Sequence, residues 1–162
     1  MRYLLTLTVC LFTGLSFAEE KLDPPLLPVE TELLKQINVE RARFGLPAMI
    51  LHPILQIQAR RHAAWMANSQ SMVHSADPQP ENISMRSSLP EAVRGWMNSS
   101  GHRANILNAS YVTTGAAGYI GPNGSVYWCQ QFSNSTDPEK IQPHATQGSS
   151  SSSSGRGFGR RR

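Results

Sequence analysis

The sequence predicts a single α+β domain in which helices come first along the chain and a β-hairpin follows. Its length of 162 residues fits one domain. Helical spacing of apolar residues fills the chain up to Tyr111, and strand-like alternation appears only after it, which is the order typical of an α+β fold. Hydrophobic residues make up 40% of the chain, a composition that allows a compact core and excludes collagen-like, coiled-coil and multi-span membrane proteins.

The first 18 residues have the three parts of a secretory signal peptide. A basic start at Met1-Arg2 precedes an apolar run, and small residues stand at Ser16 and Ala18, before the expected cleavage site. A lipoprotein signal at Cys10 is the alternative, although Val9 is bulky for the position before the cysteine. We therefore expect a mature chain that is secreted or periplasmic and has no transmembrane segment after cleavage.

Cleavage would leave Cys129 as the single cysteine, so no internal disulfide is possible. It lies in the middle of an expected strand among aromatic residues, which favours a buried thiol that packs as a small hydrophobic side chain. The alternative is a reactive thiol or an intermolecular bridge.

The helices are predicted from apolar spacing and from their start and stop signals. After a proline-rich lead-in over residues 19–28, the first is expected over residues 29–44, where apolar residues repeat at a four-residue step until a glycine and a proline stop it. The second begins at Pro53, and the third follows the capping-box pattern Ser88-Leu89-Pro90-Glu91. A short helical turn is expected over His102–Leu107.

Two strands are predicted after the helices. The first covers Tyr111–Ile120, and the second covers Ser125–Phe132, where apolar and polar residues alternate. The turn Gly121-Pro122-Asn123-Gly124 joins them into a hairpin. The folded domain is thus expected over residues 29–136.

Residues 137–162 are expected to be disordered, because six serines and a Gly/Arg-rich end cannot bury enough apolar area to offset the entropy of ordering. The net charge of +4 belongs to this tail, since residues 19–155 carry 10 basic and 11 acidic residues. A basic nucleic-acid-binding domain is therefore excluded, and no specific nucleic-acid partner is expected. The tail arginines would contact an anionic surface, or else form a solvated tail without function.

Four side chains in the central region are candidates for chemistry: His62, His74, Glu81 and His102. Two histidines and a glutamate can make a three-ligand zinc site with an open fourth position. The alternative is that they are satisfied polar residues at the edge of the domain. His62 lies on an apolar helical stripe, which favours a core histidine over a fourth ligand.

Short segments spread over Glu32–Phe132 match a known family in their order and spacing. They are Leu33-Leu34, Ile37-Asn38, His62-Ala63, Met72-Val73-His74-Ser75, Glu81-Asn82-Ile83, Trp96-Met97-Asn98-Ser99, Gly101-His102-Arg103-Ala104-Asn105, Gly115 and Tyr127-Trp128. On these segments the chain resembles the CAP superfamily, or SCP domain, of cysteine-rich secretory proteins, antigen 5 and pathogenesis-related proteins. Its short bacterial members are the most similar.

The resemblance implies an α-β-α sandwich with a central antiparallel sheet, with Ile83–Arg86 as a candidate third strand. It also implies a cleft lined by histidines and acidic residues that binds zinc or another divalent metal in several members. Its metal ligands fall on His74, His102 and Glu81. The resemblance also places Asn82 in the cleft, next to Glu81. Ser99 stands where animal members have a second acid, and this replacement lowers the negative charge available to hold a cation.

Two functions are compatible with these residues. The first is a secreted binding module for a lipid, a glycan or a protein partner at the His/Glu cleft. The second is a metal-dependent, peptidase-like hydrolase in which Glu81 is the general base. A hydrolytic zinc site needs three firm ligands and a separate base, and Glu81 cannot be both. The chain therefore lacks either the third ligand or the separate base, which favours binding over catalysis, and no catalytic residue is assigned.

Overall fold

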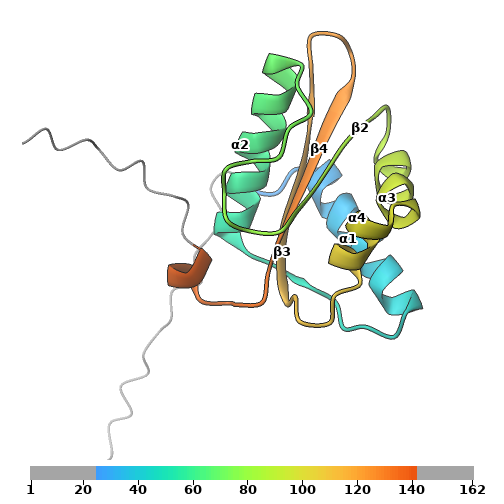
Figure 1. Ribbon diagram of the computed structural model, residues 1–162, viewed down its shortest axis with the longest axis vertical. Helices are drawn as coiled ribbons and strands as arrows, with labels where there is room; N and C mark the ends of the chain where they lie inside the picture. Colours follow the sequence, from blue (N-terminus) through green and yellow to red (C-terminus); the bar gives the residue numbers. More distant parts are fainter. Residues whose placement is uncertain (1–24, 142–162) are drawn as a thin grey trace, which may run out of the picture.

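The computed structural model describes residues 25–141, which form a sheet of four strands covered by helices on both faces (Figure 1). The predicted signal peptide, most of the lead-in and residues 142–162 of the predicted tail lie outside these residues. The elements in chain order are α1 Pro28–Arg43, β1 Ile50–Leu51, α2 Pro53–Ser69, β2 Glu81–Arg86, α3 Leu89–Asn98, α4 Ser100–Ile106, β3 Thr113–Ile120, β4 Val126–Ser133 and a 3₁₀ helix η1 Pro138–Ile141.

The strand order in the sheet is β1-β3-β4-β2. β4 pairs antiparallel with both β3 and β2, which confirms the expected hairpin and the antiparallel centre of the sheet. The candidate third strand is β2, and it begins at Glu81 instead of Ile83. The sequence does not reveal β1, because its two residues, which pair parallel to β3, are too few to show alternation.

The alternation of side chains along β4 divides the core into two layers. Tyr127 and Cys129 face α2, whereas Trp128 and Phe132 face the opposite layer of α1, α3 and α4. Figure 1 shows the same division, with α2 on one side of the sheet and α1, α3 and α4 on the other. The chain therefore has the predicted α-β-α sandwich architecture.

A glycine lets α2 approach the sheet closely. A Cβ atom on Gly115 of β3 would lie 2.2 Å from the backbone nitrogen of Gln56, which is too close for any side chain. The Gln56 side chain then pairs with both the N–H and the C=O of Ala116. This contact fixes the start of α2 against the centre of the sheet, and with it the helix that carries His62.

Arg41 ties α1 to the segment that follows α4. Its guanidinium is fully buried and donates to the carbonyl oxygens of Pro47, Ile106, Asn108 and Tyr111. Burial lowers the pKa of this group from its usual value, and the four carbonyl dipoles stabilise the charge in place of an acidic partner. Arg41 thereby fixes the end of the helix that presents His102.

Local features of three segments differ from the sequence prediction. His102 lies within α4, which begins at Ser100, two residues earlier than expected. The Ser88 side chain makes no capping bond, and Ser87 instead donates to the Glu91 carboxylate. Pro138–Ile141, expected to be disordered, form η1 against α2, because Ile141 is fully buried and anchors the segment.

Candidate functional site

The loop between α2 and β2 brings His74 to the sheet. α2 ends at Ser69, and the left-handed backbone of the next residue, Gln70 (φ 51°), turns the chain back along the helix. His62 on α2 then lies 2.8 Å, through Nε2, from the carbonyl oxygen of Val73. Because a carbonyl only accepts, His62 must carry its proton on Nε2. This bond fixes the loop immediately before His74.

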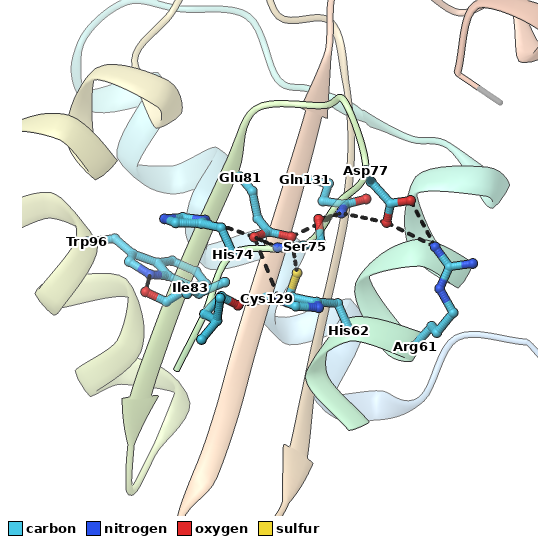
Figure 2. A network of polar contacts seen from close by, with 11 residues as sticks. Arg61, His62, His74, Ser75, Asp77, Glu81, Ile83, Trp96, Cys129 and Gln131 are labelled. Atoms are coloured by element: carbon cyan, nitrogen blue, oxygen red, sulfur yellow. Dashed lines mark hydrogen bonds and ion pairs between the residues drawn. The ribbon is translucent and has the colours of Figure 1, made fainter. Parts of the chain in front are cut away.

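Glu81, the first residue of the edge strand β2, is the centre of a polar network (Figure 2). Its side chain is 4% exposed, and both of its oxygens are engaged. Oε1 lies 2.9 Å from Nδ1 of His74 and accepts from the Ser75 amide at 3.0 Å. Oε2 accepts from Nε2 of Gln131 at 3.1 Å and from the Cys129 thiol at 3.4 Å.

The hydrogen bonds keep Glu81 ionised. Burial by itself raises the pKa of this carboxyl group, but the bonds from the Ser75 amide, Gln131 and His74 outweigh burial and leave the pKa below its usual value. An ionised carboxylate cannot donate, so Nδ1 of His74 must carry the proton. In the neutral imidazole the lone pair is then on Nε2, the atom available to a ligand or a metal.

His102 lies near His74. Burial, followed by the charge of His74, lowers the pKa of His102 from its usual value and so favours the neutral form of this ring. Together with Ser99, His102 lines a pocket of about 370 Å³ beside β2 and α3. We call this the His102 pocket; its other lining residues are Met72, Ile83, Ser84, Met85, Arg86, Gly95 and Trp96.

Asn82 positions the backbone of His102. It is fully buried, and its amide nitrogen donates to the His102 carbonyl oxygen at 3.0 Å. Its own oxygen accepts from the side chain of Asn105 at 2.9 Å. Asn82 therefore does not line the His102 pocket but connects β2 to α4, and Asn105 supports it through this side-chain bond.

The candidate metal ligands are only partly brought together. His74 and Glu81 are hydrogen-bonded, and His102 is near His74, but the Glu81 oxygens already accept bonds from protein donors. Between residues 25 and 141 there is no group of three or more His, Cys, Asp or Glu side chains arranged to hold a metal ion. With Glu81 engaged, the candidate donors that remain are the two imidazole rings.

The structure also places the two residues for which the sequence left alternatives. His62 is 7% exposed, its Nε2 bonds to the loop backbone, and its ring stacks on Trp65. Cys129 is a free, fully buried thiol, and burial, followed by the negative charge of Glu81, raises its pKa well above the usual value. These positions agree with the interpretation of His62 as a core histidine and of Cys129 as a buried thiol.

Sequence reasoning missed the residues that complete the network: Arg61, Ser75, Asp77 and Gln131. Gln131 donates to Glu81, Ser75 and Asp77, and Asp77 accepts two bonds from Arg61. Figure 2 shows these contacts running from His74 to Arg61. Gln131 lies two residues after Cys129 on β4 and so on the same, predictable face of the sheet, but its partners depend on the pairing of β4 with β2.

Comparisons with known proteins agree with this fold. A model of the cysteine-rich secretory protein family (CAP) matches residues 34–132. The uncharacterized protein YkwD of Bacillus subtilis is 31% identical over 121 residues, which cover 64% of this chain and 46% of that protein. These matches confirm the resemblance inferred from the sequence segments.

Solved structures show the same fold. An extracellular protein with an SCP domain from Bacillus anthracis is 25% identical, with a TM-score of 0.54, over 67% of this chain and 44% of that chain. An outer surface protein of Borrelia burgdorferi has a TM-score of 0.58 over 63% of this chain and 89% of that chain; at 15% identity it shows the fold alone. The chain spans less than half of the two Bacillus relatives.

Proposed function

This chain belongs to the cysteine-rich secretory protein (CAP) family, and on that premise we propose that it is an exported binding module whose His74 and His102 rings can hold a divalent cation. The observation that carries the proposal is the bond from Nδ1 of His74 to the Glu81 carboxylate. It fixes the tautomer of His74 and leaves Nε2 without a bond among residues 25–141, near a second ring whose lowered pKa favours its neutral form.

The donor set fits a cation bound by two imidazoles. Imidazole nitrogen is a common ligand of zinc, which usually takes four ligands, so two positions would remain for water or for a polar group of a bound partner. A cation held there would supply a Lewis acid that polarises such a group. Glu81 would act as the carboxylate that orients a metal-binding histidine, and the bonds to both of its oxygens hold it in place for that role.

Ser99 supports modest affinity for the cation. It lines the His102 pocket at the position where the resemblance places a second acid, and its hydroxyl brings no negative charge. The hydrolase remains the alternative function. The engagement of Glu81 favours binding, because each oxygen of this carboxylate already accepts two bonds and neither is left to act as a general base.

Export is proposed from the signal-peptide pattern of residues 1–18 and is supported by the Bacillus anthracis relative, described as an extracellular protein. No helix among residues 25–141 is both long and apolar enough to cross a membrane. The partner is a lipid, a glycan or a protein. The Arg-rich end of the tail would add contact with an anionic surface.

The proposal is tested by titrating zinc into the chain that begins at Glu19. Calorimetry should show uptake at pH about 7.5 that weakens at pH about 5.5, because imidazole must be neutral to bind the metal. His74→Ala and His102→Ala should abolish uptake, whereas the matched control His144→Ala, outside the described residues, should not. No uptake by the wild-type chain, or uptake that survives His102→Ala, would overturn the cation site.

A second assay separates binding from hydrolysis. Fluorescein-labelled casein is incubated with the zinc-loaded protein before and after a chelator is added. We expect no cleavage in either case. Cleavage that stops on chelation and is lost in His102→Ala would instead establish the hydrolase.

A further inference from the structure

A second pocket, of about 400 Å³, lies beside the His74 loop at α2. We call it the Trp65 pocket; its lining residues are Arg61, His62, Trp65, His74, Ser75, Ala76 and Asp77. Its volume falls within the range of about 300–1,000 Å³ that small-molecule sites occupy. An aromatic ring, a charged pair and a hydroxyl group line it. A mainly apolar wall with a few polar groups is typical of small-molecule sites.

Trp65 is exposed and yet held in one orientation. The residue is 49% exposed, and its indole stacks on the His62 imidazole with ring centroids 5.7 Å apart and planes within 10°. His62 is itself buried and bonded to the Val73 carbonyl oxygen, so it forms a fixed base under the indole. The stack holds the exposed indole face as a rigid apolar surface at the pocket. A ligand that covers this surface removes it from water, which favours binding.

Arg61 lies one helical turn before Trp65, on the same side of α2. Its Nη2 donates to both oxygens of Asp77, at 2.9 and 3.0 Å. The Asp77 side chain is 7% exposed and also accepts from Gln131 of β4, so the sheet holds the Arg61–Asp77 pair in place. Nε and Nη1 of Arg61 make no bond within residues 25–141, and they remain as donors beside acceptor oxygens of Asp77.

The charges select a neutral ligand. Arg61 repels a cation that would otherwise stack on the indole, and Asp77 together with the ionised Glu81 repels an anion. An alkyl chain would cover the Arg61–Asp77 pair without offering it hydrogen bonds, which is costly. A neutral ligand with an apolar face and several hydroxyl groups satisfies all of these groups at once.

From this arrangement we propose that the Trp65 pocket binds a neutral pyranose ring of a glycan. The C–H face of the sugar packs on the indole of Trp65, while neighbouring hydroxyls accept from Arg61 and donate to Asp77. The proposal rests on the function proposed above, since it names the ligand class of the binding module. It uses neither the free nitrogen of His74 nor His102, so the cation site and the sugar site can fail separately.

The experiment titrates the trisaccharides cellotriose, chitotriose and mannotriose into the chain that begins at Glu19. Binding is followed by calorimetry and by acrylamide quenching of tryptophan fluorescence. Trp96 and Trp128 are buried, so a change in quenching reports on Trp65. The variants are Trp65→Ala and Arg61→Met, and the matched control is Ile57→Ala, an equally exposed apolar residue of α2 outside the pocket.

We expect at least one of the three sugars to bind and to shield Trp65 from quenching. Trp65→Ala should weaken the affinity about tenfold or more, as truncation of an aromatic anchor does. Arg61→Met should weaken it as well, and Ile57→Ala and His102→Ala should bind as the wild type does.

Three outcomes would overturn the sugar site. They are no binding of any trisaccharide, binding that survives Trp65→Ala, and Trp65-dependent binding to phosphatidylcholine vesicles in place of sugar, which would identify a lipid surface. If the same wild-type preparation binds a sugar but takes up no zinc, the result would count against the cation site alone.

Discussion

Replacing Glu81 with alanine removes the acceptor that several donors around β2 share. The Ser75 amide loses its bond to Oε1, and Gln131 and the Cys129 thiol lose theirs to Oε2. The variant therefore leaves donors without partners, and it also leaves a cavity where the carboxylate was.

The size of the effect follows from these contacts. An unsatisfied buried donor costs about 1–3 kcal/mol. Gln131 keeps contacts to Ser75 and Asp77, and His74 is 60% exposed and can turn to water, so neither carries the full penalty. We expect Glu81→Ala to lower the free energy of unfolding by about 2–3 kcal/mol.

Glu81→Gln should cost less, about 1 kcal/mol. The amide keeps the volume of the side chain and one acceptor oxygen. Its new N–H₂ group can meet Oε1 of Gln131, which is buried and has no partner within the described residues, if the Gln131 amide flips. Urea unfolding followed by tryptophan fluorescence measures both variants, and Glu32→Ala, an exposed acid on α1, is the control that should stay within about 0.5 kcal/mol of the wild type.

The pH dependence of stability tests whether the Glu81 carboxylate stabilises the fold in its ionised form. Folding lowers the pKa of Glu81, so its stabilising contribution is complete above the unfolded value of about 4.3 and is lost as the pH falls through the lower folded value. The gap between wild type and Glu81→Gln should therefore narrow below pH about 4. Equal stabilities at neutral pH, or a gap that stays constant on acidification, would refute an ionised carboxylate held by these bonds.

Three further predictions concern the elements that position the site. Gly115→Ala should cost more than about 3 kcal/mol in chemical denaturation, because its Cβ would meet Gln56, whereas Gly101→Ala, with nothing within 4 Å, should be neutral or stabilising. Arg41→Met should cost about 3–5 kcal/mol in the same assay, since it strands buried carbonyl groups that the guanidinium now satisfies. NMR titration should give His102 a pKa below its usual value, and His74→Ala should raise it by removing the neighbouring charge; an unchanged value would show that the rings do not interact.

The sequence predicted those elements whose own residues carry a periodic signal. The apolar spacing of α1 and the alternation of β4 depend on local sequence, and both elements were found close to their expected positions. β1 was missed because two residues carry no period, and η1 was missed because its order comes from one buried side chain, Ile141, against α2.

The candidate site was predictable in part. The family segments pointed to His74, Glu81 and His102; the structure hydrogen-bonds His74 to Glu81 and places His102 close enough to His74 for their charges to interact. The network around them was not predictable, since Gln131 and Asp77 meet Glu81 and Arg61 only after β4 pairs with β2 and the loop folds over α2. Asn82 was assigned to the cleft by its place next to Glu81, but strand alternation turns it to the opposite face, where it bonds to α4.

We propose above that His74 and His102 hold one cation while Glu81 orients His74 without binding the metal. Anomalous diffraction at the zinc absorption edge, from crystals of the chain grown with zinc, locates such a cation. We expect one anomalous peak within about 2.1 Å of Nε2 of His74 and of a ring nitrogen of His102, with the carboxylate still bonded to Nδ1. A peak coordinated by the Glu81 oxygens, or no peak between the two rings, would contradict it.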